Sequence, residues 1–207
     1  MDGVQISLGS FLDYARSTPR GCAAIVRDQR GIYLDPHSMA WAFYGPFRAA
    51  LRRAVHATDP VAVVAAAVHA ARPVQQEHYR RLHAGFERWW ARTRAVGVPL
   101  GSAVWPCGEL AITVSGRSAV ALRYADGGTE VVLPYLKEPE LDGGTANLAL
   151  RVLERAMPDL LPGARPMVLD VRRGRPLRLR RNANRAELDA LIAAESAKYL
   201  VHWDAVA

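Results

Sequence analysis

Arginine side chains gather near the C-terminal end of the chain. A stretch of fourteen residues holds Arg172, Arg173, Arg175, Arg178, Arg180, Arg181 and Arg185. The guanidinium group stays charged and presents a planar fork of donors that matches a phosphate group. If the stretch forms a hairpin, alternation sends Arg178 and Arg180 to one face and Leu177 and Leu179 to the other. Such a stripe predicts nucleic-acid binding that weakens steeply with salt, and the alternative is a solvated edge strand whose charge prevents aggregation.

The chain as a whole is basic. It has 27 Lys and Arg against 20 Asp and Glu, a formal net charge of +7, and Lys137 and Lys198 are its two lysines. One interpretation is a polyanionic partner, and the other is a GC-rich coding sequence that favours Arg, Ala, Gly and Pro. We favour the partner because the arginines cluster, and further arginines are placed to extend the surface: Arg48, Arg52, Arg53, Arg80, Arg81, Arg88, Arg92 and Arg94.

Composition excludes several classes of protein. The chain has 207 residues, of which 50% are hydrophobic and 23% charged, so we expect one domain, 1–207, with a buried core and no global disorder. The N-terminal residues lack a basic stretch followed by an apolar one, and the apolar run 61–71 is too short to span a bilayer. Cys22 and Cys107 lie too far apart for a metal-ligand pair and are expected to be reduced. We therefore predict a cytoplasmic protein without a membrane partner.

The first hundred residues are predicted to be mostly helical. Apolar residues at helical spacing indicate a helix over 7–16, and 22–27 is either helix or strand. Asp-Pro pairs at 35–36 and 59–60 are typical helix starts, with a capping side chain before a proline. They predict helices that end near residues 58 and 71, and Pro73 opens a third with Leu82, Phe86 and Trp89 on its apolar face.

After Gly101 the period of the pattern changes to that of strands. Alternating or continuous apolar residues predict strands over 110–114, 120–124, 131–136 and 167–171, with a possible fifth over 177–179. A turn at 126–128 indicates a hairpin, and Pro134 favours an edge or a bulge. Helices are predicted over 145–156 and from Asn184 to about 203. The fold class is therefore α+β (mixed α/β): a helical part, 1–100, packs on a mixed sheet in 101–207 with the order β-β-β-α-β-(β)-α.

This second half, from about residue 105 to 203, resembles the core of the restriction-endonuclease-like superfamily, the PD-(D/E)XK nucleases. Residues 112–116 and 117–124 resemble its first hairpin, and 131–137 resemble the strand that carries its acid-x-lysine motif. Residues 148–156 resemble its crossover helix, and 167–172 resemble the strand that follows. The resemblance implies a fold that handles nucleic acid.

The catalytic pattern of that family is matched at one position. Its carboxylates hold Mg²⁺, and the metal and a lysine activate water against a phosphodiester. Lys137 matches the lysine, but Tyr135 stands at the acid position and 118–122 contains no carboxylate. The resemblance therefore implies a catalytically degenerate site without a metal.

The leading hypothesis is a catalytically degenerate, nuclease-like accessory or regulatory protein that binds nucleic acid without a cofactor. The residues predicted to bind are Arg172, Arg173, Arg175, Arg178, Arg180, Arg181 and Lys137. One alternative is a Mg²⁺-dependent nuclease whose displaced ligands come from Glu130, Asp126, Glu138, Glu140 and Asp170. The other is a protein-interaction scaffold, with a protein partner or a homo-oligomer, in which the basic charge is incidental.

Overall fold

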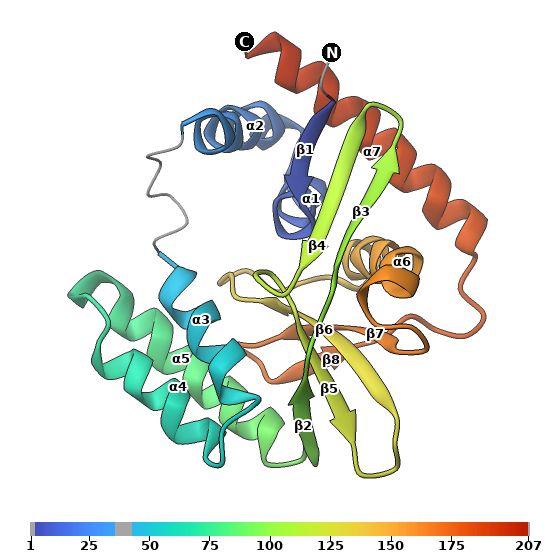
Figure 1. Ribbon diagram of the computed structural model, residues 1–207. Helices are drawn as coiled ribbons and strands as arrows, with labels where there is room; N and C mark the ends of the chain where they lie inside the picture. Colours follow the sequence, from blue (N-terminus) through green and yellow to red (C-terminus); the bar gives the residue numbers. More distant parts are fainter. Residues whose placement is uncertain (1–2, 36–42, 207) are drawn as a thin grey trace.

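The computed structural model describes residues 3–35 and 43–206, which form an α+β fold, as predicted (Figure 1). In the described part of the chain, no helix combines the length and the apolar character needed to cross a bilayer. The helices of that part are α1 (Leu8–Ala15), α2 (Pro19–Leu34), α3 (Gly45–Ala54), α4 (Pro60–His69), α5 (Pro73–Trp90), α6 (Gly143–Leu160) and α7 (Arg185–Ala205).

The strands form two mixed sheets, where one sheet was predicted. They are β1 (Val4–Ser7), β2 (Ala95–Val98), β3 (Ser102–Cys107), β4 (Leu110–Ser115), β5 (Val120–Tyr124), β6 (Thr129–Tyr135), β7 (Arg165–Asp170) and β8 (Arg175–Leu177). The smaller sheet has the order β1-β4-β3 and the larger sheet β2-β5-β6-β7-β8. The pairs β1–β4 and β6–β7 are parallel, and α6 makes the crossover between β6 and β7.

The helix starts follow the local capping signals. Asp59 accepts a hydrogen bond from the backbone of Ala62 at the start of α4, and Asn184 accepts one from Glu187 at the start of α7. The ambiguous segment 22–27 is helical and belongs to α2. Asp35 was predicted to begin a helix, but it caps the end of α2; the rest of that predicted start, 36–42, lies outside the described residues.

The expected first hairpin, 112–116 with 117–124, is wrong. β4 pairs with β1 and β3, whereas β5 pairs with β2 and β6 in the other sheet. The strands β1, β2 and β3 were not predicted. β1 and β2 come from the first hundred residues. The part predicted to be helical, 1–100, therefore contributes one strand to each sheet.

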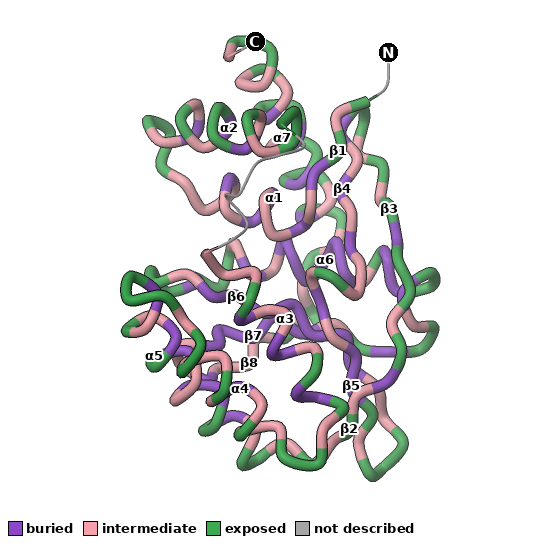
Figure 2. The backbone as a smooth tube through the Cα atoms, turned by 60° about the vertical axis from the view of Figure 1, so that its left-hand side comes forward, coloured by how far each residue is buried: buried purple, intermediate pink, exposed green. Residues whose placement is uncertain are grey.

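The centre of the molecule is formed by β6 and β7, which are buried on both faces (Figure 2). Along β6, Val131, Leu133 and Tyr135 point into the core shared with α1, α6 and the smaller sheet. Val132 points into the second core, beneath α3, α4 and α5. This two-sided burial explains the nearly continuous apolar run.

Pro134 lies in this central strand, at a place where the strand has a neighbour on one side only. The pairing of β5 with β6 ends at Val132, so the β5 side of β6 is open at Pro134. A proline is tolerated at such a place because no ladder hydrogen bond is expected from it there.

Candidate functional site

Four of the predicted phosphate-binding arginines are engaged by groups of the chain itself. Arg173 Nη1 lies 3.1 Å from Asp170 Oδ2, and Arg175 Nη1 lies 2.7 Å from Glu140 Oε1. Arg172 has an 8% exposed side chain, and its Nη2 lies 3.0 Å from His78 Nδ1. Arg178 pairs with Glu130. Most of the arginines in this stretch therefore have a partner within the chain.

The contacts of Arg173 and Arg175 also fix the loop between β6 and α6. Arg173 donates from Nη2 to the carbonyl of Glu138 at 3.1 Å, and Arg175 donates from Nη2 to the carbonyl of Leu141 at 2.8 Å. This loop, 136–142, includes Lys137. The two arginines thus have a structural role in positioning the segment that carries the predicted lysine.

Arg180 and Arg181 are the two predicted residues whose side chains make no hydrogen bond or ion pair with the described residues. Both are exposed and lie after β8, which ends at Leu177, so the predicted strand over 177–179 is displaced toward the N-terminus. Leu177 and Leu179 do pack against the core, as alternation suggested. Arg180 and Arg181 remain available for an external anion.

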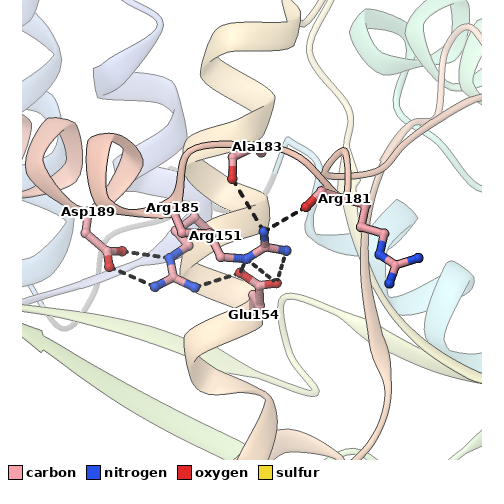
Figure 3. Close-up of polar contacts among 6 residues, drawn as sticks. All are labelled: Arg151, Glu154, Arg181, Ala183, Arg185 and Asp189. Carbon is pink, nitrogen blue, oxygen red and sulfur yellow. Dashed lines mark hydrogen bonds and ion pairs between the residues drawn. The ribbon is translucent and has the colours of Figure 1, made fainter.

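The last arginine of the stretch belongs to an ion network that ties α6 to α7. Figure 3 shows Arg151 between Asp189 and Glu154, with Arg185 on the other side of Glu154. Arg151 donates to both carboxylate oxygens of Asp189 at 2.7 Å, and Arg185 Nη2 donates to Glu154 at 2.8 Å. Each guanidinium in the network has carboxylate partners, so we assign it to stability rather than to ligand binding.

Lys137 lies just beyond the C-terminal end of β6, although the resemblance placed it on the strand, and its partner comes from the first helix. Its Nζ is 3.1 Å from Asp13 Oδ2 and 5.7 Å from the ring centroid of Tyr44. Tyr135, at the family's acid position, is buried and donates its hydroxyl hydrogen bond to the carbonyl of Pro139. Burial raises the pKa of Tyr135 to about 12, so it stays neutral and does not replace a metal-binding carboxylate.

Lys137 opens onto a cavity of about 910 Å³ between α1, α2 and α3. Its basic lining residues are Arg16, Arg48 and Lys137. Asp13 lies among them and is partly buried, while the other two acidic lining residues, Asp28 and Asp35, are exposed on α2 and at its end. Around Lys137 the cavity therefore combines three cations with one carboxylate, that of Asp13. Solvent screens the charges of the two exposed carboxylates.

Two of these cations make no polar contact through their side chains. Neither Arg16 nor Arg48 forms a side-chain hydrogen bond or ion pair with the described residues, and the Nε of each is inaccessible to solvent. Burial lowers the pKa of Arg48, while the charge of Asp13 opposes this effect. A desolvated guanidinium without acceptors is unfavourable unless an anion supplies them.

Hydroxyl groups form another wall of the same cavity. Ser10 Oγ lies 2.8 Å from the Tyr33 hydroxyl and 3.1 Å from Ser7 Oγ, and the Ser7 backbone N–H donates to Tyr33 at 2.8 Å. Ser7 also caps α1, where it accepts from the Ser10 N–H. The chain of hydroxyls joins the end of α2 to the start of α1 and presents groups that both donate and accept.

The carboxylates of the nuclease alternative do not converge. Glu130 binds Arg178, Glu138 lies near Arg81 and Arg172, Glu140 binds Arg175, and Asp170 binds Arg173. Asp126 accepts from the Gly128 N–H in the turn between β5 and β6. Within 3–35 and 43–206, no three Asp, Glu, His or Cys side chains lie close enough together to hold a metal ion.

Sequence reasoning identified Lys137 and named Arg48 as a possible extension of the basic surface, but it missed Asp13 and Arg16. Gly9, Asp13 and Arg16 are spaced to share one face of α1, which was the available signal, although it did not reveal that α3 faces them. In comparisons with protein-family models, curated proteins and solved structures, the chain has no match.

Proposed function

We propose that this protein is a nucleic-acid-binding accessory protein that holds a phosphate group in the cavity between α1 and α3. The observation that carries the proposal is the pair of guanidinium groups, Arg16 and Arg48, that line one cavity with Lys137 and lack partners among the described residues. Arginine donates two hydrogen bonds to one phosphate, and such charge-assisted bonds are strong where water is excluded.

The proposal moves the binding surface away from most of the arginine stretch. Arg172, Arg173, Arg175 and Arg178 have internal partners and are assigned to the fold. Lys137 keeps its predicted role, and Arg180 and Arg181 contribute long-range attraction. Cys22 and Cys107 are free thiols, in keeping with the cytoplasmic setting that we propose.

Fluorescence anisotropy across a salt series tests the proposal, with labelled single-stranded DNA, duplex DNA and RNA as probes. The double variant Arg48→Gln and Lys137→Gln removes two cavity cations, and its matched control, Arg180→Gln and Arg181→Gln, removes two exposed ones. We expect submicromolar wild-type binding at physiological salt, a loss of more than about tenfold in the cavity variant and about threefold or less in the control.

Two outcomes would contradict the proposal. Equal losses in the two double variants would mean that only net charge matters. Wild-type binding that disappears by physiological salt for all three probes would make the basic charge incidental and favour the scaffold alternative, whose signature is a stable oligomer or protein complex in light scattering.

A further inference from the structure

We infer that the cavity selects a terminal phosphate monoester of a nucleic-acid strand over an internal phosphodiester. This inference rests on the proposed function and specifies the chemical group that enters the site. Three observations support it: the charge balance around Lys137, the access that the cavity gives to its two arginines, and the size of the cavity.

The first observation is the charge balance. Arg16, Arg48 and Lys137 supply three positive charges, and Asp13 is the one carboxylate among them that is not exposed. The local excess is therefore two positive charges. A phosphate monoester carries about −1.5 to −2 at pH 7, whereas an internal phosphodiester carries about −1, one charge per phosphate. The monoester balances this excess more completely.

The second observation is access. Arg16 and Arg48 line the cavity although the Nε atom of each is inaccessible to solvent, so a ligand can meet these side chains only through their other atoms. An internal phosphodiester offers two free oxygens and continues into the chain on both sides. A terminal phosphate offers three oxygens and has one attachment, so it presents more acceptors to these side chains and is less obstructed than an internal phosphodiester.

The third observation is the size and polarity of the space. A volume of about 910 Å³ is that of a small-molecule site, suited to one nucleotide unit rather than a duplex. The hydroxyls of Ser7, Ser10 and Tyr33 line the same cavity and are suited to a sugar or base edge next to the phosphate. These features favour the end of a single strand.

The experiment compares otherwise identical single-stranded oligonucleotides that carry a 5′-phosphate, a 3′-phosphate or hydroxyls at both ends, with the fluorophore attached internally. Anisotropy titrations use the full chain at physiological salt. We expect one terminal phosphate to tighten binding by about tenfold relative to the hydroxyl-ended strand. The preference should disappear in Arg48→Gln and separately in Arg16→Gln, and it should persist in Arg180→Gln.

The outcomes separate the inference from the proposed function. Equal binding of all three oligonucleotides would overturn the inference and leave nucleic-acid binding intact, whereas no binding of any would overturn the function. Competition with a nucleoside monophosphate and with inorganic phosphate forms the second arm. If the mononucleotide displaces the phosphorylated strand at equal concentration, the strand is not the ligand and the inference is wrong. If the preference survives in both cavity variants, the inference is wrong.

Discussion

Arg178 and Glu130 form a bidentate ion pair across the larger sheet. Arg178 Nε lies 2.8 Å from Glu130 Oε1, and Nη2 lies 3.0 Å from Oε2. The Glu130 side chain is 1% exposed, and it also accepts a hydrogen bond of 2.6 Å from the Tyr124 hydroxyl. One of the two arginines that alternation favoured as phosphate ligands thus neutralises a buried carboxylate.

Replacing Arg178 by alanine is expected to lower stability and to leave nucleic-acid affinity nearly unchanged. The substitution leaves the buried Glu130 carboxylate without its main cation, although the Tyr124 hydroxyl remains as a donor. The free energy of unfolding should therefore fall by roughly 2 kcal/mol. Urea denaturation measures the loss. The exposed Arg180→Ala should stay within about 0.5 kcal/mol of wild type. A stable Arg178→Ala variant with weakened binding would instead return Arg178 to the phosphate-binding surface.

Signals between neighbouring residues predicted much of the fold. Contacts between residues far apart in the sequence could not be predicted from it. The helix starts at Pro60 and Arg185 could be read from a capping side chain one residue earlier, because capping depends on neighbours along the chain. The carboxylate that neutralises Arg178 lies 48 residues away, so no local pattern reveals it. The strands β4 and β5 are adjacent in sequence, but their buried side chains belong to different cores, and this separates a pair that sequence proximity would join.

The same limit applied to the candidate site. Lys137 was found because its own segment resembles the strand that carries the acid-x-lysine motif. Arg48 and Asp13 come from α3 and α1, and their proximity depends on how these helices pack. A cluster built from three segments has no signature in a single sequence.

Gly85 is predicted to be intolerant of a side chain. A Cβ at this position of α5 would lie 1.9 Å from the carbonyl oxygen of Val171 and 2.5 Å from that of Arg172. Gly85→Ala would force α5 away from the turn after β7 and should lower the free energy of unfolding by about 2–3 kcal/mol.

Gly31→Ala is the matched control for that variant. Gly31 lies inside α2 and has nothing within 4 Å of the added Cβ, so alanine should stabilise the helix by roughly 0.5–1 kcal/mol. Thermal melts followed by circular dichroism distinguish the two signs. If both variants melt at or above the wild-type temperature, the prediction that Gly85 does not tolerate a side chain is wrong.

The ion network of α6 and α7 predicts a loss of stability in acid. The hydrogen bonds from Arg151 lower the pKa of Asp189. Burial alone would raise the pKa of Glu154, but the hydrogen bonds from Arg185 and Arg151 outweigh it and lower that pKa too. Folded-state pKa values below the unfolded ones of about 4 mean that the network stabilises fully above this pH. Its contribution is lost as the pH falls through the folded-state values.

Urea denaturation at a series of pH values between 3 and 7 measures this dependence. Asp189→Asn should lower stability at pH 7 by roughly 1–3 kcal/mol and flatten the decline below about pH 4. Asp159→Asn, on the exposed side of α6 and without a side-chain partner among the described residues, should follow the wild-type curve. An unchanged decline in Asp189→Asn would assign the acid sensitivity to other carboxylates.

Arg48 is expected to be costly to the free protein and necessary for its ligand. Its guanidinium is largely desolvated and has no hydrogen-bond acceptor among the described residues, and the charge of Asp13 is the largest effect that offsets the burial. Arg48→Met keeps the length of the side chain and removes the charge, so it should raise the free energy of unfolding by roughly 1 kcal/mol. The same variant should lose the terminal-phosphate preference.

Arg151→Met is the contrasting variant: its guanidinium is fully paired, so its loss should destabilise the protein by roughly 3 kcal/mol. Thermal melts of the wild type with and without a phosphorylated oligonucleotide complete the test, because a ligand of the folded state raises its melting temperature. Destabilisation by Arg48→Met would mean that Arg48 already has its partner in the free protein, and the cavity would lose its claim to be an anion site.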